Sequence, residues 1–182
     1  MFKKFEEKED ISSVTNAKNS KAKAIRKRVC EDYGVPIEFV EQIVPKKDVL
    51  KCVKCHEHIE LFADTQGDVL FFCQRDGPFI PTLKVLHKYP FILPHLQVDR
   101  GAIKHVLNGS NIMCPGLTSP GARMTQVPEG SVVAIMAEGK EHALAIGITT
   151  LSTDDILSVN KGVGVENVHY LNDGLWRLKS IR

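Results

Sequence analysis

Residues 96–116, LQVDRGAIKHVLNGSNIMCPG, contain the pattern that decides the fold of this chain. Asp99 is suited to cap a helix, because its carboxylate can accept hydrogen bonds from free backbone N–H groups one turn on. Asn108 and Gly109 are a stop signal, since glycine adopts the left-handed conformation of a helix end without a Cβ penalty. The stretch therefore predicts a short strand, a short helix, a tight turn and a strand that ends at a Pro-Gly turn. The apolar side of the helix is predicted to consist of Ala102, Ile103, Val106 and Leu107.

This order of elements resembles the opening of a PUA domain, the small RNA-binding fold of pseudouridine synthases and archaeosine transglycosylases. The residues that carry the resemblance are Asp99, Gly101, Ala102, Val106, Gly109, Pro115 and Gly116. Ser110 stands where that family usually has alanine. The resemblance implies that the helix and its loops face RNA. The alternative interpretation is a helix–strand corner in another small β-barrel.

Downstream, the chain continues as short strands separated by turns, which is typical of a small barrel. Residues 117–127 are predicted to form an exposed loop, and Ser152 is predicted to cap a short helix through Val159. The strands are expected at 132–137, 143–151, 165–170 and 175–178, the last two joined by an Asn-Asp-Gly turn.

The N-terminal half alternates helical and strand patterns. A helix is predicted from Ser20, as its cap, to Tyr33, with Gly34 as its end. A second short helix, three strands and a third helix are expected at 36–42, 49–55, 58–63, 69–74 and 82–89. We therefore predict an α+β protein, with a small N-terminal α/β domain over residues 1–92 and a PUA pseudo-barrel over residues 93–182.

Composition indicates a soluble cytoplasmic protein that does not associate with membranes. No apolar run approaches the roughly 20 residues of a membrane helix, and the charged N-terminus lacks the apolar core of a signal peptide. The five cysteines are an odd number without a disulfide framework, so reduced thiols are expected. Net charge is only +2, but residues 18–28 hold six cations and no acid, and Lys46–Lys54 form a second basic cluster. Either cluster could touch phosphate or be a solvated surface.

Catalytic and metal-binding patterns are weak. Cys52, Cys55, His56 and His58 have the residue types of a zinc site, but a strand would place Cys52 and Cys55 on opposite faces. No nucleophile elbow, dinucleotide motif or deaminase motif is present. The sequence therefore predicts no enzyme, no catalytic residue, no metal site and no cofactor.

Seven segments spread over the chain form a second, more specific set of motifs: MFKKF at 1–5, PKKD at 45–48, CHEHIE at 55–60, LHKYPFILPH at 86–95, IMCPGLTSPGA at 112–122, VAIMAEGK at 133–140 and HYLNDGLW at 169–176. Together they resemble the family of malignant-T-cell-amplified sequence proteins. The resemblance implies a heterodimer with density-regulated protein that acts on the small ribosomal subunit. Its implied roles are alternative modes of initiation, re-initiation after short upstream frames, and tRNA release during ribosome recycling. Ribosomal RNA is the expected nucleic-acid partner, with tRNA as a further candidate. A second hypothesis is an RNA-binding component of an RNA-modification system, of the pseudouridylation type.

The candidate RNA-binding residues are cations on the loops and helix of the predicted PUA domain. They are Arg100 and Lys104 on the central helix, Arg123 in the loop, Lys140 on the hairpin tip, and Lys161. His105 is the candidate partner-binding residue, because it is predicted to lie near the edge of the apolar face of the helix. Each of these side chains could also be ordinary surface.

Overall fold

The computed structural model describes residues 1–182 and divides into two compact units. The N-terminal unit comprises Phe5–Val85 with Arg177–Arg182, and the C-terminal unit comprises Met1–Lys4 with Leu86–Trp176. Each unit is thus completed by a short segment from the opposite end of the chain. No helix combines the length and the apolar character that crossing a membrane requires.

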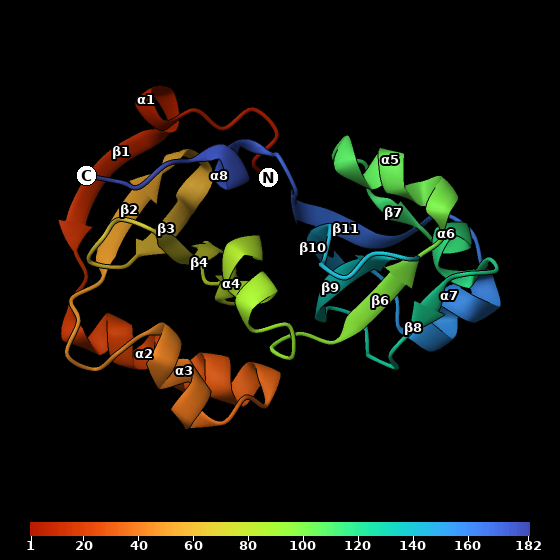
Figure 1. Cartoon of the computed structure of the whole chain (residues 1–182), viewed down its shortest axis with the longest axis horizontal. Helices are drawn as coiled ribbons and strands as arrows, with labels where there is room; N and C mark the ends of the chain where they lie inside the picture. Colours follow the sequence, from red (N-terminus) through yellow and green to blue (C-terminus); the bar gives the residue numbers. More distant parts are fainter. The chain divides into compact units, whose positions relative to one another are not determined.

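The N-terminal unit is built on a five-stranded antiparallel sheet in the order β1-β2-β3-β4-β5. The strands are β1 (Ile11–Asn16), β2 (Lys51–Cys55), β3 (Ile59–Ala63), β4 (Val69–Gln74) and β5 (Ile80–Pro81). The helices are α1 (Glu7–Asp10), α2 (Asn19–Tyr33), α3 (Ile37–Ile43) and the 3₁₀ turn η1 (His56–His58). Figure 1 shows α2 and α3 side by side below the sheet. Helix α4 (Leu83–Lys88) contains the boundary between the units.

Helix α2 shows which local signals determined the structure. Ala22, Ile25 and Val29 are buried, as their spacing predicts, and Gly34 ends the helix with a φ of 64°. The predicted cap was wrong, because α2 begins at Asn19 and its N-cap, Lys18, makes no side-chain capping bond.

The C-terminal unit contains a six-stranded sheet in the order β7-β11-β10-β9-β6-β8. Its strands are β6 (His95–Val98), β7 (Ile112–Met113), β8 (Arg123–Met124), β9 (Val132–Ala137), β10 (Ala145–Thr149) and β11 (Val163–Tyr170). Only β6 and β9 pair in parallel. The helices are η2 (Arg100–Ala102), α5 (Ile103–Leu107), α6 (Cys114–Thr118), α7 (Thr153–Val159) and α8 (Gly174–Arg177). The α+β class predicted from the sequence is confirmed.

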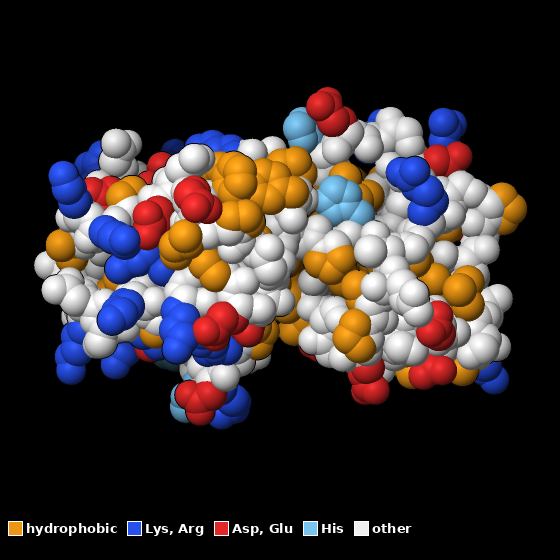
Figure 2. Space-filling model, turned by 90° about the horizontal axis from the view of Figure 1, so that it is seen from below, with side chains coloured by type: hydrophobic (Ala, Val, Ile, Leu, Met, Phe, Trp, Pro, Cys, Tyr) orange, Lys and Arg blue, Asp and Glu red, His pale blue; other side chains and the backbone are white.

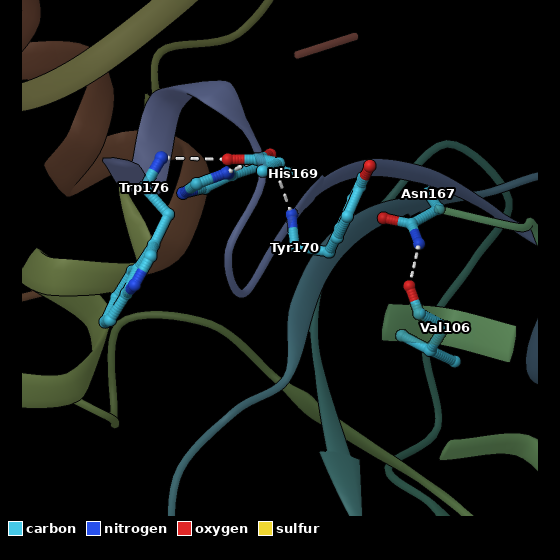
Figure 3. A network of polar contacts seen from close by, with 6 residues as sticks. Val106, Asn167, His169, Tyr170 and Trp176 are labelled. Carbon is cyan, nitrogen blue, oxygen red and sulfur yellow. Dashed lines mark hydrogen bonds and ion pairs between the residues drawn. The ribbon is translucent and has the colours of Figure 1, made fainter. Parts of the chain in front are cut away.

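The structure corrects three local predictions. Residues 114–118 form helix α6 instead of a turn and loop, with proline in its first turn and with Cys114 and Leu117 buried. Residues 174–177 form helix α8 instead of a strand, because the Asp173 carboxylate accepts the backbone N–H of Trp176 at 2.8 Å and caps the helix (Figure 3). Leu107 is 37% exposed, so it does not belong to the buried side of α5.

Candidate nucleic-acid interface

The connection from β6 to η2 places the first candidate cation, Arg100. Asp99 Oδ1 accepts the backbone N–H of Ala102 at 2.9 Å, which confirms the predicted cap. The Asp99 N–H donates to the carbonyl of Gly116 at 3.1 Å, so α6 is bound to the same corner. Arg100 follows directly and is exposed.

The turn between β9 and β10 comes to this corner because β6 and β9 are parallel neighbours. Val98 pairs with Ala137, and the N–H of Glu138 donates to the carbonyl of Val98 at 3.1 Å. Arg100 Nη2 lies 3.5 Å from the position that a Cβ atom on Gly139 would occupy. Arg100 is therefore packed against the turn that carries Lys140, which is also exposed.

Arg123 reaches the same corner from the opposite side of β6. It pairs with Gln97 as part of β8, which corrects its predicted placement in a loop. Arg123 Nη2 donates to Gln97 Oε1 at 3.1 Å, and Gln97 Nε2 donates to the carbonyl of Gly121 at 2.7 Å. The Arg123 guanidinium is thus oriented by a side chain that is itself fixed by the backbone.

Glycine permits the close approach of these segments. Gly121 has a φ of 91°, and a Cβ atom there would collide with the Glu138 carboxylate. We define the β6–β9 rim as Gln97, Arg100, Gly121, Arg123, Glu138, Gly139 and Lys140. The rim gathers two guanidinium groups and one ammonium group around short backbone segments, an arrangement suited to phosphate oxygens. Glu138 is the acidic member of the rim.

The remaining candidates occupy two different places. Lys104 is exposed on α5 four residues after Arg100, so the two lie on one side of a continuous helical segment. Lys161 follows α7, where the Asn160 side chain accepts from the Thr118 hydroxyl at 2.6 Å and the Gly162 carbonyl accepts from the Cys114 N–H at 2.9 Å. The structure therefore brings Arg100, Lys104, Arg123 and Lys140 together and places Lys161 at the corner between α6 and α7.

His105 is exposed on α5, and the buried anchor of that helix is its neighbour Val106. Asn167 of β11 holds this part of the chain. Its Nδ2 donates to the carbonyl of Val106 at 3.1 Å (Figure 3) and to the carbonyl of Ser110 at 3.0 Å. Gly109 lies in between with a φ of 85°, and a Cβ atom there would meet the Tyr170 ring. Sequence reasoning missed Asn167. An amide in an apolar strand signals a buried hydrogen bond, but it does not identify the partner.

The two basic clusters of the N-terminal unit are partly neutralised within the unit. Lys21 lies 3.3 Å from the Glu60 carboxylate and Lys46 lies 2.8 Å from the Glu41 carboxylate. Arg28 stacks over the Phe79 ring, with its Cζ atom 4.9 Å from the ring centroid. The left part of Figure 2 shows cations and acids intermixed on one face of this unit.

The segment that resembles a zinc site contains two buried thiols and two exposed imidazoles. Cys52 and Cys55 are buried on β2, whereas His56 and His58 are exposed in η1. Burial raises the pKa of Cys55 to about 12 and also raises the pKa of Cys52. Zinc binds the thiolate form of cysteine, which these environments disfavour. No three His, Cys, Asp or Glu side chains of the chain gather in a way that could hold a metal ion.

Models of two known domain families match the chain in succession. A sequence model of a Pre-PUA-like domain matches residues 5–90, and a model of the PUA domain matches residues 94–171. The predicted order of a small α/β domain followed by a PUA pseudo-barrel is therefore confirmed.

Relatives align over the whole chain. Malignant T-cell-amplified sequence 1-A of Xenopus laevis is 57% identical over 182 residues, which is 100% of both chains. The chain belongs to the malignant T-cell-amplified sequence family. Malignant T-cell-amplified sequence 2 of Homo sapiens is 55% identical over 100% of both chains, and the Dictyostelium discoideum homolog is 48% identical over 97% of both. This member of the malignant T-cell-amplified sequence family is accordingly an RNA-binding PUA protein, as its motifs predicted.

Solved structures share the fold of this family member at lower identity. A hypothetical protein from Pyrococcus horikoshii has a TM-score of 0.73 at 24% identity, covering 90% of this chain and 98% of that chain. A conserved PUA domain protein from Thermoplasma acidophilum has a TM-score of 0.66 at 21% identity, covering 91% of this chain and 98% of that chain.

Proposed function

We propose that this protein is a non-enzymatic translation factor of the cytoplasm that binds the small ribosomal subunit as a heterodimer with density-regulated protein. Its roles would be alternative modes of initiation, re-initiation, and tRNA release during ribosome recycling. Membership of the malignant T-cell-amplified sequence family over the whole chain supports this proposal. The structural observation that carries it is the β6–β9 rim.

The rim would hold ribosomal RNA through its backbone. Arg123 is oriented by Gln97, and Arg100 is packed on Gly139, so both guanidinium groups lose little freedom when they bind phosphate. Lys104 and Lys140 add flexible cations beside them. Such contacts position a protein on RNA without reading its sequence, which suits a factor that recognises one place on a large folded RNA. Transfer RNA would be a second ligand for the same rim.

The buried polar side chains of the C-terminal unit have structural roles, which supports a non-enzymatic function. His169 Nδ1 and the Asp173 carboxylate are hydrogen-bonded at 2.7 Å, but the two side chains are 1% and 0% exposed, so no substrate could reach them. We therefore expect density-regulated protein to act by docking on this chain. Exposed His105 on α5 is our candidate contact for it.

The test is binding of purified small ribosomal subunits by the full chain, measured by sedimentation or by fluorescence titration at several salt concentrations. Arg123→Glu combined with Lys140→Glu should weaken binding while the circular dichroism spectrum is unchanged. The log–log salt slope should fall by about 0.7 to 0.9 for each phosphate that the variant no longer neutralises. Lys161→Glu should have a smaller effect, because Lys161 lies at another corner of the unit.

The matched control is Lys8→Glu with Lys179→Glu, two exposed lysines outside the rim and outside both basic clusters. It makes the same change in net charge and should leave the salt slope unaltered. If the rim variant and this control reduce binding equally, the rim is not the RNA-binding surface.

A further inference from the structure

The outer edge of β1 is an unprotected sheet edge. β1 is the first strand in the order of its sheet, and no strand covers its other side (Figure 1). Its sequence, ISSVTN, has no charged residue and no proline, and Ser12–Asn16 are all exposed. Natural proteins usually guard an exposed edge with lysine, proline or a covering segment. The single irregularity is a register shift between Ile11 and Ser13, which leaves the strand regular from Ser13 onward.

The register shows which backbone groups of β1 point outward. The N–H of Ala17 donates to the carbonyl of Leu50 at 2.7 Å, and Thr15 pairs with Cys52 two residues earlier in the same register. Hydrogen-bonded and non-hydrogen-bonded pairs alternate along antiparallel strands, so Ala17 and Thr15 direct their backbone groups toward β2. The backbone N–H and C=O groups of Val14 and Asn16 therefore point away from the sheet.

A hollow runs beside this edge. Two cavities of about 810 Å³ and about 430 Å³ adjoin each other at Lys21, Lys54 and Glu60. The first is lined by Ser12 and Ser13, and the second by Thr15 and Asn16, so together they follow β1 along its length. We call this hollow the β1 groove.

Charge differs between the two ends of the β1 groove. Lys18 lies at the end beside Thr15 and Asn16, and Lys54 lies where the two cavities adjoin. Neither lysine has a carboxylate within ion-pair distance, and Glu60 pairs with Lys21. The opposite end is mixed, because cationic Arg75 is accompanied there by Glu57 and Asp76. No Phe, Tyr or Trp side chain lines either cavity, so the groove lacks the large stacking platforms on which proteins hold single-stranded nucleic acid, although the imidazoles of His56 and His58 line the first cavity.

We propose that β1 is a docking edge for an extended peptide segment of a protein partner that carries acidic side chains. The peptide would add a strand to the sheet by pairing its backbone with Val14 and Asn16. Side chains of a strand alternate between its two faces, so every second residue would enter the β1 groove. Its acidic side chains would lie beside Lys18 and Lys54. Nothing in this inference depends on RNA binding by the C-terminal unit.

The experiment uses the full chain and a set of capped hexapeptides in which glutamate alternates with valine, threonine or isoleucine. Binding is followed by amide hydrogen exchange and by NMR titration. The expected result is slower exchange at the Val14 and Asn16 amides and no comparable effect from peptides in which lysine replaces glutamate. Absence of binding by every acidic peptide, or binding without protection of these two amides, would overturn the proposal.

Two pairs of variants test the geometry. Val14→Pro removes an N–H that the sheet does not use, whereas Val14→Ala retains it. Val14→Pro should weaken peptide binding about tenfold, the equivalent of one net hydrogen bond, and Val14→Ala should leave it nearly unchanged. Lys18→Glu with Lys54→Glu should also weaken binding, unlike Lys23→Glu with Lys47→Glu, two exposed lysines that do not line the groove.

If Val14→Pro does not fold, the glutamate variants of Lys18 and Lys54 still test the proposal. A single-stranded oligouridine serves as the competing ligand. If oligouridine protects Val14 and Asn16 and the acidic peptides do not, the β1 groove is a nucleic-acid site and the peptide proposal is wrong. The peptide proposal would also be refuted if peptide affinity did not change when Lys18 and Lys54 are both replaced by glutamate.

Discussion

The Nδ1 atom of His169 lies 2.7 Å from the Asp173 carboxylate inside the C-terminal unit, where the two side chains are 1% and 0% exposed. The same carboxylate accepts the backbone N–H groups of Tyr170 at 3.0 Å and Trp176 at 2.8 Å (Figure 3). Asp173 thus joins the end of β11 to the start of α8. The Gly174 N–H donates to the carbonyl of Phe2 at 2.9 Å, so the N-terminal segment is held at the same place.

Replacing Asp173 with alanine should therefore destabilise the protein strongly. It would remove the carboxylate that accepts from the His169 imidazole and from two backbone N–H groups, and each hydrogen bond to a charged group is worth about 1.5–3 kcal/mol. The free energy of unfolding from urea titration measures the loss. Asp155→Ala is the matched control, because that carboxylate is exposed in the first turn of α7 and its helix-end interaction is worth about 0.3–1 kcal/mol. Equal losses for the two variants would contradict the structural role of Asp173.

Local signals in the sequence were sufficient for most elements of the fold. The caps at Asp99 and Ser152 and the helix ends at Gly34 and Gly109 all behave as predicted. They succeed because the interactions are formed within a few residues of the chain. Helix α8 was missed because Asp-Gly signals a hairpin turn as well as a helix cap, and the choice depends on contacts with β11.

The candidate nucleic-acid interface could be predicted from the sequence only in part. Exposed cations near the helix could be identified, but the rim exists only because β6 lies between β9 and β8. That strand order brings Glu138 to Val98 and Arg123 to Gln97, and no local pattern encodes it. The same applies to Asn167, whose partners lie on α5 and in the following turn.

Gln97 provides a test of orientation without a change of charge. Gln97→Ala removes the acceptor that holds the Arg123 guanidinium, a net hydrogen bond worth about 0.5–1.5 kcal/mol. Subunit binding should weaken by roughly the corresponding factor, up to about tenfold, while the salt slope stays that of the wild-type protein. Titrations at several salt concentrations separate the two quantities. A reduced slope would mean that Gln97→Ala displaces a cation altogether, contrary to this prediction.

The buried cysteines predict how stability changes at alkaline pH. Burial raises the pKa of Cys55 to about 12 and that of Cys73 to about 11, from an ordinary value near 9. As pH rises from about 9 toward 11, the unfolded chain loses these thiol protons while the folded chain keeps them, so the unfolding free energy should fall. Urea titrations at successive pH values measure this. The double variant Cys55→Ala with Cys73→Ala should show a shallower decline, and an unchanged decline would refute the assignment to these thiols.

The segment from Cys52 to His58 should hold no structural zinc. Structural zinc contributes much of the folding energy of a small domain, so its removal would lower the melting temperature markedly. We expect the purified protein to contain no equimolar zinc and to melt at the same temperature with and without a chelator. Elemental analysis and thermal melting followed by circular dichroism provide the measurements. Zinc at one equivalent, lost together with helicity on chelation, would show that the segment rearranges to bind metal.

His105 is the test of partner binding through the C-terminal unit. It is exposed on α5, next to Val106, whose buried side chain and carbonyl bond to Asn167 fix the orientation of the helix. A substitution at His105 should therefore leave the fold intact. His105→Asp places a charge at the proposed contact, and an unpaired charge desolvated by a partner costs several kcal/mol. Co-purification with density-regulated protein should then fail, while the circular dichroism spectrum matches the wild type.

The matched control is Ser158→Asp, which adds an aspartate at an exposed position of α7 and should still co-purify. If His105→Asp retains the partner as well as this control does, His105 is ordinary surface and the docking surface lies elsewhere on the chain.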